Sequence, residues 1–350
     1  MRLDKKRKPY QNHWLFLSLI CLTYFFISLF NSPYSDRNTI ETLFFHFTIY
    51  TRYFVPFFFI FWSTKSVIYL FKNREKGCLG LRDCWHELAT EYVTRDNIFR
   101  LIILFLLLPL FKFSYNNIKQ GIPLYNNTYD LIFHRIDYLI HGNNIPWEIL
   151  QSLIGKPIIT RFIDYCYLFW GTLYLFTIYW ITVSRRNFLR LQYFYSLSAC
   201  WILIGNVAAK FFASVGPCFY SKVITTSTNP YQHMMGYLRA IPDLKAVQIQ
   251  DVLWHTRTHE IFIPWGGISA MPSMHVSIAT LTALAFSNIN KWFSFTMILL
   301  ALIIQVGSVH LGCHYAIDGY ISVLATLAIW FTTERLLQFF GLSKTPLSPE

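Results

Sequence analysis

Long apolar runs separated by short polar segments dominate this chain. A transmembrane helix needs about 20 consecutive apolar residues, and eight stretches approach that length: 13–31, 53–71, 98–114, 162–183, 191–213, 271–289, 292–311 and 315–333. The run Leu101–Phe111 carries no charge, whereas Lys65 interrupts the second stretch. The two-residue alternation of membrane β-barrels is not visible. The pattern predicts an all-α integral membrane protein with about eight transmembrane helices.

The composition agrees with this class. Only 14% of the 350 residues are charged, against about 25% in a typical soluble domain. The net charge of +12 could by itself suggest nucleic acid, but the basic residues cluster in alternate connections, as the positive-inside rule describes. We therefore expect no nucleic acid partner, and both termini in the cytoplasm. The connections 214–270 and 310–314 then fall on the non-cytoplasmic side.

The same reading divides the chain into three regions. Residues 1–97 hold an N-terminal cytoplasmic segment, two added spans and a polar cytoplasmic loop. Residues 98–335 form the main membrane domain, and residues 336–350 form a cytoplasmic tail. No small-residue cleavage site follows Phe30, so we interpret the first span as an uncleaved anchor and not as a signal peptide.

Polar and apolar positions alternate with helical spacing between residues 130 and 142. The apolar stripe comprises Ile132, Ile136, Leu139 and Ile140, and the opposite stripe comprises Asp130, His134, Asp137 and His141. This pattern predicts an amphipathic helix in the membrane interface with its polar face in water. The polar stripe could alternatively bind a metal. We expect no metal and no other cofactor, because no Asp-rich cluster suited to magnesium is present.

Two segments with the residues of phosphate chemistry lie at the ends of apolar runs. The first reads Pro272-Ser273-Met274-His275, where proline suits a helix start and free amides would attract an anion. The second reads His314-Tyr315-Ala316-Ile317-Asp318. A helix would bring His314 and Asp318 onto one face, so that the carboxylate holds one ring nitrogen and the other is free to attack.

Lys210 adds a positive charge at the end of the fifth apolar run. A lysine this close to a span is costly unless it reaches the interface or meets an anion. Both explanations remain open from the sequence, although the other polar residues at span ends favour an anion. His310, one turn before His314, could also contact an anion or could simply pack at the interface.

These segments together resemble the type 2 phosphatidic acid phosphatase superfamily, with its signatures K-x6-R-P, P-S-G-H and S-R-x5-H-x3-D. Pro272–His275 matches the second with methionine in the glycine place, and His314–Asp318 matches the end of the third. The first is degenerate, since Lys210 is followed by Gly216-Pro217 without an arginine, and Gly307-Ser308 replaces the Ser-Arg pair. These departures, with Ala213–Tyr220, look like the inositol phosphotransferase branch, which contains fungal inositol phosphorylceramide synthase.

The resemblance covers roughly residues 98–335 and implies a six-helix core and specific roles. His314 would be the nucleophile that forms a phosphohistidine, Asp318 would orient it, and His275 would act as general acid and base. Lys210 and Ser273 would bind phosphate, with His310 as a further candidate. The implied substrate is a membrane lipid with a phosphate head group, and the acceptor is a polyol or water.

The sequence is also compatible with other functions. A lipid phosphate phosphatase, of the phosphatidic acid or polyprenyl diphosphate type, would share all the chemistry up to the phosphohistidine. A proton-coupled transporter could use His310, His314 and Asp318 as a relay, although no internal repeat is visible. Cys218 and Cys313 could pair or remain separate thiols. The oligomeric state is not predicted.

Overall fold

The computed structural model describes residues 8–31, 39–72, 81–122, 128–225, 228–289 and 291–344, and all regular secondary structure in these ranges is helical. Seven helices are long and apolar enough to cross a membrane. The class predicted from the sequence, an all-α integral membrane protein, is confirmed. The seven are α1 (Lys8–Phe30), α2 (Thr39–Lys72), α4 (Arg95–Gln120), α7 (Pro157–Val183), the continuous helix α8–η2–α9 (Asn187–Phe211), α14 (Lys291–His310) and α15 (Ala316–Phe339).

The predicted span 271–289 is shorter in the structure than its apolar run. Helix α13 covers only Met274–Ser287, 14 residues, which rise about 21 Å at 1.5 Å per residue and fall short of a roughly 30 Å hydrocarbon core. The run begins at residue 271, but Met271–Pro272 is not helical and Ser273 is the N-cap. Apolarity alone did not reveal that the first residues belong to a buried loop.

The second span is longer than its predicted range 53–71, because α2 already begins at Thr39. Lys65, which made this stretch uncertain, lies in α2 beside aromatic rings. Its ammonium nitrogen is 5.1 Å from the ring centre of Tyr92 and 5.2 Å from that of Trp180. Aromatic faces attract cations, so this arrangement accommodates a charge within a membrane helix.

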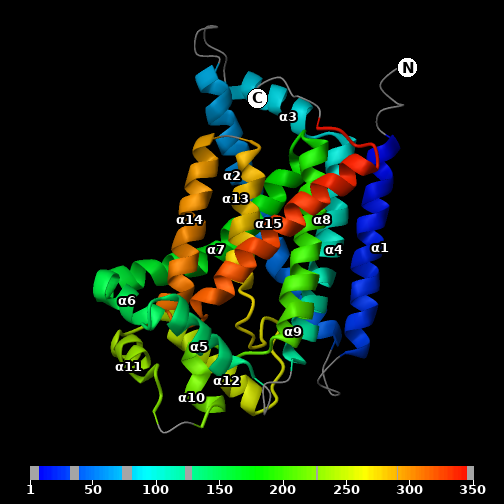
Figure 1. Ribbon diagram of the computed structural model, residues 1–350. Helices are drawn as coiled ribbons and strands as arrows, with labels where there is room; N and C mark the ends of the chain where they lie inside the picture. Colours follow the sequence, from blue (N-terminus) through cyan, green and yellow to red (C-terminus); the bar gives the residue numbers. More distant parts are fainter. Residues whose placement is uncertain are drawn as a thin grey trace.

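The long helices form a bundle, and the short helices gather at its two ends (Figure 1). Helix α3 (Leu81–Tyr92) lies at the end where α1 begins and α15 finishes. The opposite end carries α5, α6 and α10–α12. Their bounds are Asp130–Ile140, Pro146–Ile154, Tyr220–Val223, Gln232–Ala240 and Lys245–Thr258, and η3 (Pro217–Phe219) precedes α10. The predicted phosphate-chemistry segments lie toward this second end.

Helix α5 is amphipathic, as predicted, but its two faces are used in the opposite sense. Ile132 and Leu139 are more than half exposed, whereas Asp130 and Asp137 are fully buried. The expectation of a water-facing polar stripe is therefore wrong. The sequence pattern located the stripe correctly, but it could not show that the stripe packs against the protein while the apolar face points outward.

Candidate active site

A short segment between α9 and η3 holds the two predicted motifs together. The backbone N–H of Ala270 donates to the carbonyl of Ser214 (2.9 Å), and the N–H of Met271 donates to the hydroxyl of Ser214 (2.9 Å). On the other side, Gly216 has a φ of +88°, and a Cβ there would lie 2.6 Å from the carbonyl oxygen of Cys313. Only glycine allows this conformation and this close approach. The segment therefore joins the loop before α13 to the loop before α15.

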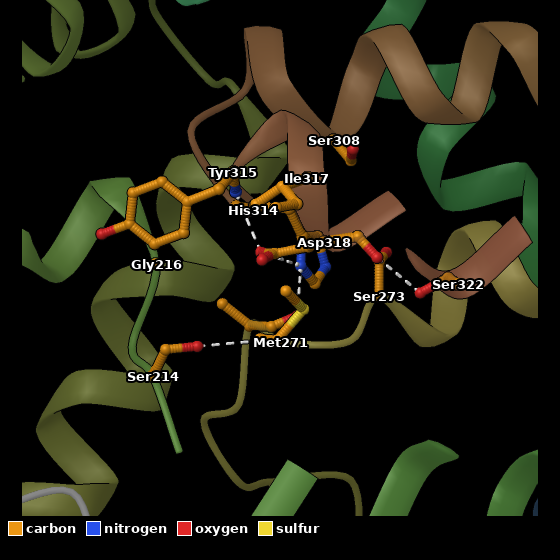
Figure 2. A network of polar contacts seen from close by, with 12 residues as sticks. Ser214, Gly216, Met271, Ser273, Ser308, His314, Tyr315, Ile317, Asp318 and Ser322 are labelled. Carbon is orange, nitrogen blue, oxygen red and sulfur yellow. Dashed lines mark hydrogen bonds and ion pairs between the residues drawn. The ribbon is translucent and has the colours of Figure 1, made fainter. Parts of the chain in front are cut away.

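His314 is held by one ring nitrogen (Figure 2). Its Nδ1 lies 2.8 Å from the carbonyl oxygen of Ala270 and 3.3 Å from Oδ2 of Asp318. A carbonyl oxygen only accepts hydrogen bonds, so the proton of the neutral ring sits on Nδ1. The lone pair is then on Nε2, for which the described residues offer no hydrogen-bond partner. This is the tautomer that a nucleophilic histidine requires.

Asp318 lies on the first turn of α15 and makes three further contacts. Its Oδ2 accepts the backbone N–H of Tyr315 (2.9 Å), the N-cap residue of α15. Its carbonyl oxygen accepts the backbone N–H of Ser273 (3.3 Å) and the hydroxyl of Ser322 (2.6 Å). The carboxylate is fully buried beside the imidazole, so it stabilises a positive charge on His314 and fixes the turn that carries it.

Two more buried carboxylates, Asp130 and Asp137 of α5, support this turn. Asp137 accepts the N–H groups of Ala316 (2.6 Å) and Ile317 (2.9 Å), two free donors at the start of α15. Burial raises the pKa of Asp137 to about 6, and these two amides act in the opposite direction. Asp137 thus positions the helix that presents His314 and Asp318.

Asp130 performs the matching role for the joining segment. It accepts the backbone N–H groups of Val215 and Gly216 and the hydroxyl of Tyr315 (2.9 Å). Burial raises the pKa of Asp130, while the amides and the tyrosine lower it. The sequence pattern identified Asp130 as part of a polar helix face. Its supporting role could not be predicted, because its partners Val215 and Tyr315 lie 85 and 185 positions away in the chain.

His275 faces His314 across the site. The two ring centres are 6.0 Å apart, and the His275 ring stacks on Tyr167 at 4.5 Å and contacts the tilted ring of Trp170 at 4.6 Å. Within the described part of the chain, no residue forms a hydrogen bond with the His275 ring. Its nitrogens are therefore available for proton transfer, while the aromatic rings fix its plane.

Ser273 occupies a different place from the one expected of a phosphate ligand. It is fully buried, and its hydroxyl accepts the N–H of Val276 at 3.5 Å as the N-cap of α13. A cavity beside His275 and His314 is lined by Pro272 and Met274, the two neighbours of Ser273, and not by Ser273 itself. Ser269, whose buried hydroxyl has no partner among the described residues, does line the cavity. Nothing in the sequence around Ser269 distinguishes it as a ligand.

The cavity beside the two histidines has a volume of about 460 Å³. Its cations are Lys112 and Lys119 of α4, not Lys210, which is exposed and absent from the lining. Lys112, Tyr115, Asn116 and Lys119 all line the cavity, with the spacing of one helix face. Polar residues at positions i, i+3, i+4 and i+7 near the end of the third apolar run are the sequence pattern that could have predicted these lysines. Helix α2 also contributes to the wall, so the N-terminal region takes part in the site.

The remaining candidates are His310, the cysteine pair and a metal site. His310 is fully buried, its Nε2 is 2.9 Å from the hydroxyl of Thr160, and it is not part of the lining. The structure therefore does not bring His310 to the site. Cys218 and Cys313 both line the cavity as free thiols and form no disulfide. Among the residues that the structure describes, no group of three or more acidic, histidine or cysteine side chains is arranged to bind a metal.

Comparison with known proteins gives one match. The family model of the PAP2 superfamily matches residues 133–332, which are more than half of the chain. Neither curated proteins nor solved structures give a match. The matched range contains His275, His314 and Asp318, whereas Lys112, Lys119 and Asp130 precede it. A membrane bundle with this histidine pair, and a match of this extent, show that the chain belongs to the PAP2 superfamily of phosphatase- and phosphotransferase-type lipid enzymes.

Proposed function

We propose that this protein is a lipid phosphotransferase of the inositolphosphotransferase type that works through a phosphohistidine. The observation that carries the proposal is the fixed tautomer of His314, whose Nδ1 is held by Ala270 and Asp318. Nε2 then presents a lone pair to a cavity lined by His275 and two lysines. An oriented nucleophile, a proton donor and cations around one space are the parts that phosphoryl transfer uses.

The reaction proceeds in two displacements. Nε2 of His314 attacks the phosphorus of the donor lipid, the N–P bond forms, and the bond from phosphorus to the lipid oxygen breaks. His275 gives its proton to the leaving oxygen. In the second step the acceptor hydroxyl returns a proton to His275 and its oxygen attacks the phosphorus, which releases His314. Asp318 stabilises the charged ring between the two steps.

The developing charge on the phosphate oxygens requires compensation. Lys119 lines the cavity beside Gly267, in the loop that carries Ala270, and the first-turn amides of α13 lie beside His275, where a helix N-terminus favours anions. These groups perform the charge stabilisation that a metal provides in other phosphoryl transfer enzymes. We therefore propose a metal-independent reaction.

Transfer is favoured over hydrolysis by the walls of the cavity. Tyr167, Trp170 and Trp201 line it and expose mainly apolar faces. Such a space disfavours free water and provides flat surfaces against which the C–H faces of a polyol can pack. A lipid phosphate phosphatase remains the second candidate, in which water takes the place of the acceptor hydroxyl.

The test is a product assay with the purified full chain in detergent. With a phosphoinositol lipid as donor and a lipid alcohol as acceptor, we expect transfer product to exceed hydrolysis product, with activity nearly unchanged in excess EDTA. Water-dependent release alone would support the phosphatase, and collapse on chelation with recovery on adding a divalent ion would disprove metal independence.

Asp318→Asn should reduce turnover by about 10²- to 10³-fold. The asparagine removes the negative charge beside His314, but Ala270 still fixes the tautomer. The loss should therefore be smaller than the roughly 10⁴-fold loss seen where a carboxylate alone sets it. Steady-state kinetics of the purified variant provide the measurement. A loss below about tenfold would mean that Asp318 acts only through its capping contacts.

We propose that the active site faces the non-cytoplasmic side, as the positive-inside rule implies. His233 of α11 and Lys291 at the start of α14 are both exposed and lie at opposite ends of the bundle. In a cysteine-free background, a cysteine at position 233 should react with an impermeant thiol reagent added outside. A cysteine at position 291 should react only after the membrane is opened. The reverse pattern would place the site on the cytoplasmic face.

A further inference from the structure

Part of the cavity wall, which we call the inner end, comes from residues well away from the ends of the long helices and is not used by the proposed phosphotransfer chemistry. This inner end is lined by His46 and Tyr50 of α2, Lys112 of α4, and Trp201 and Gly205 of η2. Lys112 lies two helical turns further into the span than Lys119, about 10 Å along the axis of α4. The wall of this inner end thus comes partly from α2 and α4, which precede the range that the family model matches.

The charge of Lys112 has no carboxylate partner among the described residues. Its ammonium nitrogen lies 3.4 Å from the ring centre of Trp201 and 4.6 Å from that of Tyr115. The only acidic side chain in the cavity lining is Asp164, whose two oxygens accept the backbone N–H groups at the start of α12. A charge within a membrane span is costly unless it meets an opposite charge, so a bound anion would remove a cost that the aromatic rings offset only in part.

Two more polar groups at the inner end have no well-formed hydrogen bond within the described part of the chain. His46 is 5% exposed and Trp201 is 3% exposed. No described residue holds Nε2 of His46 or Nε1 of Trp201 in good hydrogen-bond geometry, although the Pro264 carbonyl lies near the His46 ring and the Tyr174 hydroxyl lies near the indole. Such groups are rare in folded proteins unless something else binds them. The indole and the ammonium are donors only, and an anion would favour the protonated, donating form of His46. The set suits an anion and offers little to a neutral ligand.

The two lysines are arranged for two anionic groups. Lys119 packs its side chain against Gly267, three residues before Ala270, whose carbonyl binds His314. The ammonium group of Lys112 lies against Trp201, 3.4 Å from its ring centre, in the middle of the helix α8–η2–α9. Lys119 is thus beside the loop that carries Ala270, and Lys112 is at the inner end. One phosphate near His314 would leave Lys112 uncompensated.

We infer that the inner end binds a second phosphate group of the substrate, carried on the head group and separated from the phosphate that is transferred. The inference rests on the proposed function for the location of the first phosphate. The ligand class is a polyol head group with two phosphates, one at His314 and one between Lys112, His46 and Trp201. A lipid diphosphate, whose two phosphorus atoms are adjacent, fits this spacing less well.

The test is direct binding of soluble head groups to the full chain in detergent by titration calorimetry. The probes are an inositol monophosphate, an inositol bisphosphate with its phosphates on opposite sides of the ring, and inorganic diphosphate. We expect the bisphosphate to bind at least about tenfold more tightly than the monophosphate, since charge-assisted hydrogen bonds are the strong ones. Lys112→Met should remove this difference, and Lys222→Met, at an exposed lysine of α10, should retain it.

Two further variants keep the result interpretable. If Lys112→Met does not fold, Trp201→Phe, which removes the indole N–H, should still reduce the preference for the bisphosphate. His314→Ala should still bind the bisphosphate more tightly than the monophosphate. An error in the proposed nucleophile would therefore change the turnover measurements and not this binding measurement. Equal affinity for all three probes, or a preference unchanged by Lys112→Met and Trp201→Phe, would overturn the inference. The inference would also be contradicted if Lys112 increased the affinity for diphosphate but not the affinity for the bisphosphate.

Discussion

His314→Ala is expected to abolish turnover, with a loss of about 10⁶-fold, the size seen when a catalytic nucleophile is removed. In the proposed mechanism the imidazole provides the atom that bonds to phosphorus, and its neighbour His275 has no hydrogen bond among the described residues that would fix its tautomer. Its loss should leave the fold intact, because its ring contacts are with Ala270 and Asp318. Turnover and thermal unfolding of the purified variant provide the two measurements.

A matched control is available in the same part of the chain. His310 is also buried, but it contacts Thr160 and does not line the cavity. His310→Gln should therefore lower thermal stability more than turnover, whereas His314→Ala should do the reverse. Equal losses of turnover in the two variants would mean that His314 acts through structure and not as the nucleophile.

The second large effect is expected for His275→Ala, which should reduce turnover by about 10²- to 10⁴-fold, the usual contribution of a general acid or base. The ring is held between Tyr167 and Trp170, 6.0 Å from His314. Its proton is needed when the leaving group is a poor one, such as the alkoxide of a lipid alcohol. An aryl leaving group departs without protonation.

The loss should accordingly depend on the leaving group. Under single-turnover conditions, His275→Ala should be strongly impaired with an alkyl ester donor and only weakly impaired with an aryl ester donor. The same fold-loss with both donors would contradict the assignment of His275 as the proton donor and would leave it as a structural part of the wall.

The helical membrane fold was predictable because long apolar runs have few other structures in a lipid bilayer. The local motif around His314 was predictable for a similar reason, since a four-residue spacing places His314 and Asp318 on one helical face. The more direct tautomer-fixing contact, from Ala270, was not predictable. It comes from a residue 44 positions away, and nothing in the local sequence indicates such a pairing.

The cations of the cavity show the same limit more sharply. Lys210 and Lys112 look alike in sequence, since each follows an apolar run. The structure places Lys210 at the surface and turns Lys112 and Lys119 toward the cavity. The direction in which a helix presents its polar face depends on its neighbours. It therefore becomes visible only when α2, α4 and η2 are packed together.

The central claim is that turnover passes through a covalent bond between phosphorus and His314. The most direct measurement uses His275→Ala with an aryl ester donor, because the first step then proceeds while the second lacks its base. After quenching in alkaline detergent, which preserves phosphohistidine, mass spectrometry should find the phosphate-linked head group on the peptide that contains His314. Product formation without any adduct, or an adduct on another residue, would contradict the account.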